Sequence, residues 1–378
     1  MKVFEGSSTK GRAQEAILEA INHWDDGFSP SILFVFHSTT QDPHDIAEKL
    51  TKHFPNTTIV GATTSGEWIS GQHKNDALVL LGMLTPEMRW SMSVVEDLNA
   101  SPDQVVKQTL DELMQQLNIK WNDLNATKHF CLSFFDGMSR REEPFIAAMS
   151  KELGDISLLG GSAGDDLKFK GTYVIANGKA YQNAAVFILA ESKTSFHAIK
   201  HQHFVPGDID VVITKADVDR RLVYRLDGMP AAQRYAQLMG LEVGELTPQI
   251  FSDNPLIYPY GNECYVRALR RVCEEGSLEF GCAIEEGMIL NLCKHQDMTQ
   301  EYDKLMLELK QNLGEVKVLL VYNCIYRALE GKYADINQTL AERTSAITEH
   351  MIGFDTYGEQ WQGLHMNQTL VALALGSK

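Results

Sequence analysis

The stretch ILFVFHSTTQDPHDIAEKLTKHFPNTTIVGATTSGEW, residues 32–68, and the run ALVLLG, residues 77–82, decide the fold. ILFVFH at 32–37 is a short apolar run typical of a buried strand. A helix is predicted to begin near Asp42 and Pro43, and its apolar side chains share one face. A second strand, the turn GATTSGEW and a third strand follow. The strand–helix–strand order predicts a parallel pair with a right-handed crossover. The third strand, reached through a hairpin-sized loop, is expected to be antiparallel, which makes the sheet mixed.

This pattern occurs three times in the chain. The second copy comprises HFCLSFFDG (129–137), SRREEPFIAAMSKEL (139–153), SLLGGSAGDDL (157–167) and AAVFILA (184–190). The third comprises VKVLLVYNC (316–324), ADINQTLAERTSA (334–346), HMIGFDTYGEQW (350–361) and LVALALG (370–376). Gly61 of the first turn aligns with Gly160 of the second. The repetition predicts packed α/β modules of common origin, although strand–helix–strand units can also resemble one another by chance.

Two domains are expected. The runs 88–98 and 195–206 are predicted to extend the first and second copies by one strand each. The stretch that follows has a different pattern, with a hairpin over 210–226 and a helix over 230–240. We therefore predict an α/β (α+β) fold of mixed sheets packed with helices, built from repeated strand–helix–strand–hairpin modules. It is divided into tightly apposed domains at residues 1–220 and 221–378.

Composition limits the function classes. The chain has 378 residues, 44% of them hydrophobic, and a net charge of −16. Such an acidic surface repels nucleic acid and anionic membranes. The longest apolar runs are far shorter than the roughly 18 residues that span a bilayer, and the first residues lack the apolar run of a signal peptide. A cytoplasmic protein with neither nucleic-acid nor membrane partner is therefore expected.

The glycine turns are candidate ligand-binding loops. Glycine allows the backbone to approach a ligand closely, and free backbone N–H groups can bind an anion. Neither turn matches a phosphate-binding motif or the G-x-S-x-G motif of hydrolases. The turns are therefore either structural or part of a cleft for a small ligand. The candidate lining residues are Gly61, Ser65, Glu67, Gly161, Ser162 and Asp165.

The segment SFHAIKHQHFVPGD, residues 195–208, places three histidines within seven residues. On a strand, His197, His201 and His203 would share one face. Histidine is the commonest ligand of transition metals, and one histidine beside an apolar pocket can hold haem iron. Three interpretations remain open: an exposed polar strand face, haem ligation or direct metal chelation.

Arginine and tyrosine residues near the C-terminal third could clamp a carboxylate. Tyr260 and Arg267 lie together in NPLIYPYGNECYVRAL, and Arg327 lies in NCIYRAL, near the start of a predicted helix. Each is as well explained by a structural role.

Together these motifs resemble the FIST family of intracellular bacterial sensory proteins along nearly the whole chain. GATTSGEW and LLGGSAGDD resemble signature turns of the FIST N-terminal domain. PLIYPYGNECYVRALRRV with EEGMILNL resembles the opening of the FIST C-terminal domain, and NCIYRAL, GFDTYGEQ and HMNQTLVALAL resemble its end. The resemblance implies that residues 1–220 and 221–378 are the two FIST domains. It also implies a sensor that binds a small ligand and performs no catalysis.

One subgroup of the family consists of nitric-oxide sensors that bind haem b through a histidine, and HQHF at 201–204 is similar to its histidine site. That resemblance implies that His203 holds the haem iron, with His201 and His197 as the next candidates and Phe204 and Pro206 beside them. It further implies regulation of a separate histidine kinase, with effects on biofilm, and leaves a homodimer open.

Two alternatives stand beside the haem sensor. The first is a haem-free FIST sensor of an amino acid or similar metabolite. The second is a hydrolase that acts through Ser162 or Cys324.

Overall fold

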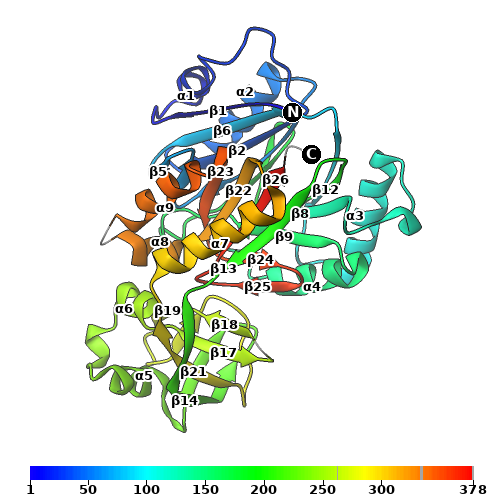
Figure 1. The fold of residues 1–378 in the computed structure, drawn as a ribbon. Helices are drawn as coiled ribbons and strands as arrows, with labels where there is room; N and C mark the ends of the chain where they lie inside the picture. The colour runs from blue at the N-terminus through cyan, green and yellow to red at the C-terminus, as the bar shows by residue number, and fades with distance from the viewer. Residues whose placement is uncertain (262, 333–334, 377–378) are drawn as a thin grey trace.

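Three copies of one folding unit make up most of the molecule. The computed structural model describes residues 1–261, 263–332 and 335–376, and it contains three six-stranded sheets with the same strand order (Figure 1). In each sheet the two strands that flank the crossover helix are parallel, and the last strand of the repeat pairs antiparallel with the first of them. The predicted mixed α/β fold is therefore confirmed.

The first repeat begins at the N-terminus. Its elements are β1 (Lys2–Ser8), α1 (Ala13–Ala20), β2 (Ile32–Ser38), α2 (Pro43–His53), β3 (Thr58–Thr64), β4 (Glu67–Ile69), β5 (Gln72–Lys74) and β6 (Leu78–Leu84). Asp42 starts α2 as the sequence predicted, because its side chain accepts the backbone N–H of Asp45.

The second repeat has the same order. Its elements are β7 (Met88–Val95), α3 (Pro102–Leu117), the 3-10 helix η1 (Trp121–Asp123), β8 (His129–Phe135), α4 (Glu142–Leu153), β9 (Ser157–Ser162), β10 (Val174–Ala176), β11 (Lys179–Tyr181) and β12 (Ala185–Ser192).

The third repeat is interrupted by an insertion after its first strand. Its elements are β13 (Phe196–His201), α7 (Met298–Leu313), β22 (Val316–Cys324), α8 (Ile325–Gly331), α9 (Ile336–Ser345), β23 (Thr348–Thr356), β24 (Glu359–Trp361), β25 (Leu364–Met366) and β26 (Leu370–Gly376).

Residues 204–295 form a separate antiparallel sheet inserted between β13 and α7. Its elements are β14 (Phe204–Asp217), β15 (Leu222–Leu226), β16 (Met229–Pro230), α5 (Ala231–Met239), the 3-10 helix η2 (Val243–Glu245), α6 (Pro248–Asp253), β17 (Leu256–Tyr260), β18 (Glu263–Arg267), β19 (Leu269–Val272), β20 (Leu278–Phe280) and β21 (Ile289–His295). This inserted sheet has its own core and lies at the bottom of Figure 1. The predicted boundary at residue 220 falls in the turn between β14 and β15, which pair with each other.

Two strands belong to different repeats than the sequence suggested. The runs 88–98 and 195–206 were expected to extend copies one and two. Instead β7 pairs with β12 of the second repeat, and β13 pairs with β26 of the third. Each is the edge strand that opens the next repeat, a relation that spacing along the chain does not reveal.

The repeats exchange their hairpins in a cycle. The loop after the second parallel strand is a hairpin that pairs with the sheet of another repeat: β4 with β23, β10 with β3, and β24 with β9. The three repeats therefore form one interlocked unit. Gly61, Gly160 and Gly353 mark equivalent positions on the receiving strands. An added Cβ there would lie 1.7, 1.8 and 2.2 Å from a backbone oxygen of the neighbouring strand, so these positions require glycine.

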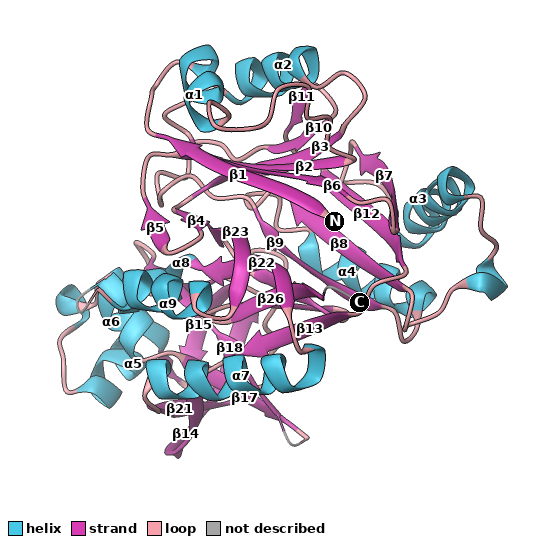
Figure 2. Cartoon of the chain, turned by 45° about the horizontal axis from the view of Figure 1, so that its top comes forward, coloured by secondary structure: helices cyan, strands magenta, loops and turns pink. Residues whose placement is uncertain are grey.

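One apolar core joins the inner faces of the three sheets. Phe36, Phe134 and Tyr322 stand at equivalent positions, and they meet around Phe354 with ring centroids 4.5–6.5 Å apart. The outer face of each sheet is covered by two helices of its own repeat: α1 and α2, α3 and α4, or α7 and α9 (Figure 2). Within the described residues, none of the helices has the length and apolar character needed to cross a membrane.

Candidate functional site

A cavity of about 410 Å³ at the carboxyl end of β23 joins the three repeats. Its wall is built from the first glycine turn (Ser65), the β4–β5 hairpin (His73, Asn75) and the loop after β9 (Asp166, Leu167). Helices α8 and α9, their connection and Asp355 complete it. Open α/β sheets bind ligands at this end of their strands. Residues from all three repeats therefore meet around one cavity.

Asp355 is the most elaborately held polar group of this cavity. Its side chain is fully buried, and Oδ1 accepts hydrogen bonds from Trp68 Nε1 at 2.8 Å and Asn323 Nδ2 at 2.7 Å. Oδ2 lies 2.7 Å from His73 Nε2. A carboxylate fixed by two donors orients the imidazole, and a carboxylate can only accept, so Nε2 of His73 donates to it. The pair presents a fixed acid–imidazole unit to the cavity.

The loop of residues 165–171 covers the cavity and is backbone-strained. Asp166, Leu167 and Phe169 have φ of 56°, 58° and 49°, the left-handed region that non-glycine residues rarely adopt. Asp165 holds the loop, since its carboxylate accepts the N–H groups of Phe169, Lys170 and Gly171 at 2.7–3.1 Å. Such strain is characteristic of ligand-binding loops.

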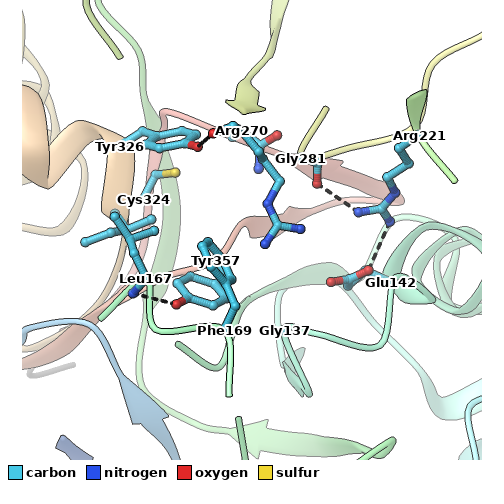
Figure 3. A pocket seen from close by; sticks show the side chains of 12 residues that line it. Gly137, Glu142, Leu167, Phe169, Arg221, Arg270, Gly281, Cys324, Tyr326 and Tyr357 are labelled. Atoms are coloured by element: carbon cyan, nitrogen blue, oxygen red, sulfur yellow. Dashed lines mark hydrogen bonds and ion pairs between the residues drawn. The ribbon is translucent and has the colours of Figure 1, made fainter. Parts of the chain in front are cut away.

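A second, smaller cavity of about 20 Å³ lies next to the first, and Leu167 and Ile325 line both (Figure 3). Arg270 extends into it from β19, with its guanidinium 4.6 Å from the ring centroid of Phe169. The carboxylate of Glu279 lies 2.9 Å from Arg140 and 2.7 Å from Arg271. Its distance to Arg270 is longer, at 3.5 Å. One carboxylate cannot neutralise three guanidinium groups, so Arg270 keeps positive charge at this end of the site.

The glycine-turn residues predicted from sequence divide into two groups. Ser65 lines the larger cavity, where its Oγ accepts the N–H of Asp166 at 2.9 Å. Asp165 does not line the larger cavity, but its carboxylate holds the loop 165–171 through backbone N–H groups. Gly61 and Gly161 lie within the sheets, where strand and side-chain neighbours leave no room for a Cβ. Ser162 is buried and accepts a hydrogen bond from Gln360 Nε2 at 2.9 Å.

Glu67 is a structural residue, and it has a twin in the third repeat. Glu67 hydrogen-bonds to Thr64 Oγ1 and to the N–H of Ala77, whereas Glu359 hydrogen-bonds to Thr356 Oγ1 and to Thr369. Burial raises the pKa of each carboxyl to about 8. Both are therefore neutral links that fasten the turn to the start of the following strand.

The histidine run spans a junction between two sheets. His197 and His201 lie on β13, and the chain leaves that sheet at residue 202 before β14 begins. His197 is half-buried, His201 and His203 are buried, Phe204 packs on His203 with ring centroids 4.2 Å apart, and Pro206 is exposed. The predicted alternation holds along β13, because Phe196 and Ala198 face the common core while Ile199 faces α7.

His203 does not fit the role of an axial haem ligand in this arrangement. Arg327 Nη1 lies 3.1 Å from Nδ1, and Glu330 Oε1 lies 2.7 Å from Nε2. Because arginine can only donate, Nδ1 accepts and Nε2 carries the proton toward Glu330. No lone pair is left for iron. His201 differs, since it is buried and neither ring nitrogen has a hydrogen-bond partner in the part of the chain that the structure describes.

The same proton placement bears on a metal ion. His203, His295 and Glu330 bring one ligand atom each within 4.8 Å of one another, the spacing of a metal site. An ion at Nε2 of His203 would require its proton to move to Nδ1, where the guanidinium of Arg327 already donates. These residues form a hydrogen-bonded chain rather than a ready metal site.

Two of the predicted carboxylate-clamp residues, Arg267 and Arg327, line neither cavity. Arg327 is fully buried on the side of α8 that faces His203, and burial lowers its pKa to about 10. Arg267 lies over the ring of Tyr258 at 5.7 Å. Tyr260 ends β17 opposite Glu263, and its side chain lies outside the described part of the chain. Cys324 is buried with a pKa raised well above its usual value by burial, which opposes a role as nucleophile.

Sequence reasoning missed several lining residues, notably His73, Arg270, Leu167 and Asp355. Asp355 and His73 lie in segments recognised as a strand end and a hairpin, but 282 residues separate them. The one available signal was the loop after β9, where the second repeat carries extra residues between its glycine turn and its hairpin.

Comparisons with known proteins divide the chain within the inserted sheet, between β16 and α5. The FIST N domain matches residues 31–229, and the FIST C domain matches residues 231–362. The chain belongs to the FIST family, whose domains act as sensors in signal transduction and are generally not enzymes. An uncharacterized protein of Methanocaldococcus jannaschii is 26% identical over 351 residues, which are 88% of this chain and 66% of that protein. The chain thus spans just under two thirds of the length of that relative.

Proposed function

We propose that the protein is a haem-free sensor that binds an amino acid, or a metabolite with the same pair of charges, across the two adjoining cavities. The observation that carries this proposal is the charge distribution on either side of Leu167 and Ile325. The larger cavity has Asp166, Asp335 and Asp355 in its wall against one lysine, Lys332. The smaller cavity has Arg270 beside Arg221 and Glu142, which pair with each other. A ligand with an ammonium group at one end and a carboxylate at the other matches both.

The contacts of the charged residues in the two cavities support this proposal. Burial raises the pKa of Asp166, whose carboxylate pairs at 3.2 Å with the partly exposed Lys168, so a ligand ammonium group would compete with Lys168 for it. Arg270 shares one carboxylate with two other arginines, so a ligand carboxylate would complete its pairing. The hydroxyl of Tyr357 accepts the N–H of Leu167 at 2.7 Å, which fixes the residue between the two cavities.

In this proposal the sensor passes its signal to a separate partner protein. The family resemblance points to a histidine kinase in trans. The covering loop 165–171 and helix α8 are the elements whose position a bound ligand would alter, because both line the cavity. A change of their position would present a different surface to the partner.

Haem b with nitric oxide as the signal is the second candidate. The observation that favours it is His201, a buried histidine with two unpartnered ring nitrogens beside Tyr302. Bound haem would supply an open iron site for the gas. The hydrogen bonds of His203 to Arg327 and Glu330 oppose its predicted role as the haem ligand, so within this second candidate His201 is the ligand to test.

Thermal unfolding with the twenty standard L-amino acids tests the first candidate, since a ligand of the folded state raises Tm. Arg270→Gln should abolish the shift, whereas Arg271→Gln should keep it, because Arg271 is exposed and bonded to the same Glu279. A shift equal in both variants, or none with any amino acid, would reject the proposal. Titration with hemin, followed by absorption of wild type and His201→Ala, tests the second.

A further inference from the structure

Helix α8 separates the larger cavity from the inserted sheet. Ile325, Ala328 and Leu329 line the cavity. Arg327 and Glu330 are three residues apart and therefore share a face, and they contact His203 and His295 on the other side of the helix. Both partners of these contacts lie at the ends of the inserted sheet. One helix thus has a ligand face and an inserted-sheet face.

A chain of hydrogen bonds runs across the inserted-sheet face, and we name it the α8 clamp: Arg327, His203, Glu330 and His295. Arg327 donates to Nδ1 of His203, and Nε2 of His203 donates to Glu330. His295 Nδ1 lies 3.4 Å from the same Glu330 oxygen, and its Nε2 hydrogen-bonds to the backbone oxygen of Asp253 at the end of α6. The clamp thereby ties α8 to β21 and α6.

Charge strengthens the clamp. Hydrogen bonds from His203 and His295 outweigh burial and lower the pKa of Glu330 to about 2. The bond to Glu330 raises the pKa of His295. A second tie acts on the same helix, since Ser252 Oγ of α6 donates to the carbonyl oxygen of Tyr326 at 2.7 Å.

The clamp also has unused hydrogen-bonding capacity. Within the described residues, Glu330 Oε2 and the Nε and Nη2 atoms of Arg327 are buried and make no hydrogen bond. Buried polar groups of this kind are costly, so a shift of the helix that gave them hydrogen-bond partners would lower that cost. Two arrangements with different contacts are the requirement for a coupled switch.

From this arrangement we infer that the α8 clamp couples the ligand cavity to the position of the inserted sheet. Its four residues are positioning residues for the cavity wall. A ligand that shifts α8 changes the clamp, and loss of the clamp loosens the cavity wall. The inference rests on the proposed function for the nature of the signal, but the mechanical link can be tested without any ligand.

Hydrogen exchange of the full chain tests the link. Glu330→Gln and His295→Ala should speed exchange of the amides of Ala328 and Leu329, on the cavity side of α8, by about fivefold or more. Lys294→Ala is the matched control, since Lys294 is an exposed neighbour of His295 that pairs with Asp208. It should leave α8 exchange at the wild-type rate.

Each outcome is decisive for the inference. Faster exchange confined to β21, or unchanged exchange at α8 in both variants, would overturn it. If α8 responds but no amino acid raises Tm in the wild type, the coupling stands and the proposed ligand class fails. If an amino acid binds but α8 does not respond, the proposed function stands and the coupling fails.

Discussion

The turn of the second repeat differs from those of the first and third, and the difference separates folding from binding. In the first and third repeats a threonine and a buried glutamic acid join the turn directly to its hairpin: Thr64 with Glu67 and Thr356 with Glu359. In the second repeat the equivalent positions hold Ala163 and Val174, and the strained loop 165–171 lies between them. All three turns contribute to the cavity walls, through Ser65, Leu167 and Tyr357, but the first and third also fasten the sheets, whereas the second carries the strained loop.

The largest expected effect comes from the position that all three repeats share. Gly61→Val would place side-chain atoms against Val35 of the neighbouring strand, where even a Cβ would come within 1.7 Å of the oxygen. We expect a loss of more than about 4 kcal/mol in the free energy of unfolding, measured by urea denaturation. Gly11→Val is the control, because nothing lies within 4 Å of its added Cβ, and it should change stability by less than about 0.5 kcal/mol. Equal losses of stability in the two variants would contradict the claim that close strand packing requires glycine at position 61.

The two buried acids predict a pH dependence of stability. Their folded pKa of about 8 exceeds the usual value of 4.5, so the folded state holds a proton that the unfolded chain releases. The stabilisation is complete below about pH 4.5 and is lost as pH rises toward 8, with a slope of about 1.4 kcal/mol per pH unit for each group.

Denaturation at several pH values between 5 and 8 measures this slope. The double variant Glu67→Gln, Glu359→Gln should give a flatter profile than wild type, because neither amide titrates. Parallel profiles for the two proteins would show that these acids are ionised when folded.

The second turn should respond to mutation locally. Asp165→Ala removes the acceptor for the amides of residues 169–171, and we expect a loss of about 2 kcal/mol. Exchange of those amides should quicken while β3 and β9 stay protected. Asp155→Ala, at an exposed site, is the control. Faster amide exchange throughout the sheets would show that this turn holds the sheets together, as the other two turns do.

The smallest expected effect has the opposite sign. Leu167→Gly relieves a positive φ of 58° and should raise the free energy of unfolding by about 1 kcal/mol, while it weakens amino-acid binding through the lost contact. Leu84→Gly on strand β6 should destabilise the protein by about 1 kcal/mol. If Leu167→Gly also destabilises, the loop is not strained for function.

The sequence predicted the repeated units well because hydrophobic periodicity and glycine turns report local structure. Parallel and antiparallel pairing, the start of α2 and the equivalence of Gly61 with Gly160 were predicted correctly, whereas the matching Gly353 was not recognised. The hairpin exchange and the assignment of β7 and β13 depend on pairing between distant segments, which periodicity does not encode. Ser65 was found because it belongs to a turn motif. Arg270 belongs to the inserted sheet and Asp355 to the third repeat, so only the fold places them in adjoining cavities.

A crystal structure with bound amino acid, chosen by the largest rise in Tm, tests the central claim most directly. We predict the ammonium group beside Asp355 and Asp166, the carboxylate beside Arg270, and Leu167 between them. A ligand located beside His201 and His203, or one that leaves both cavities empty, would contradict the claim.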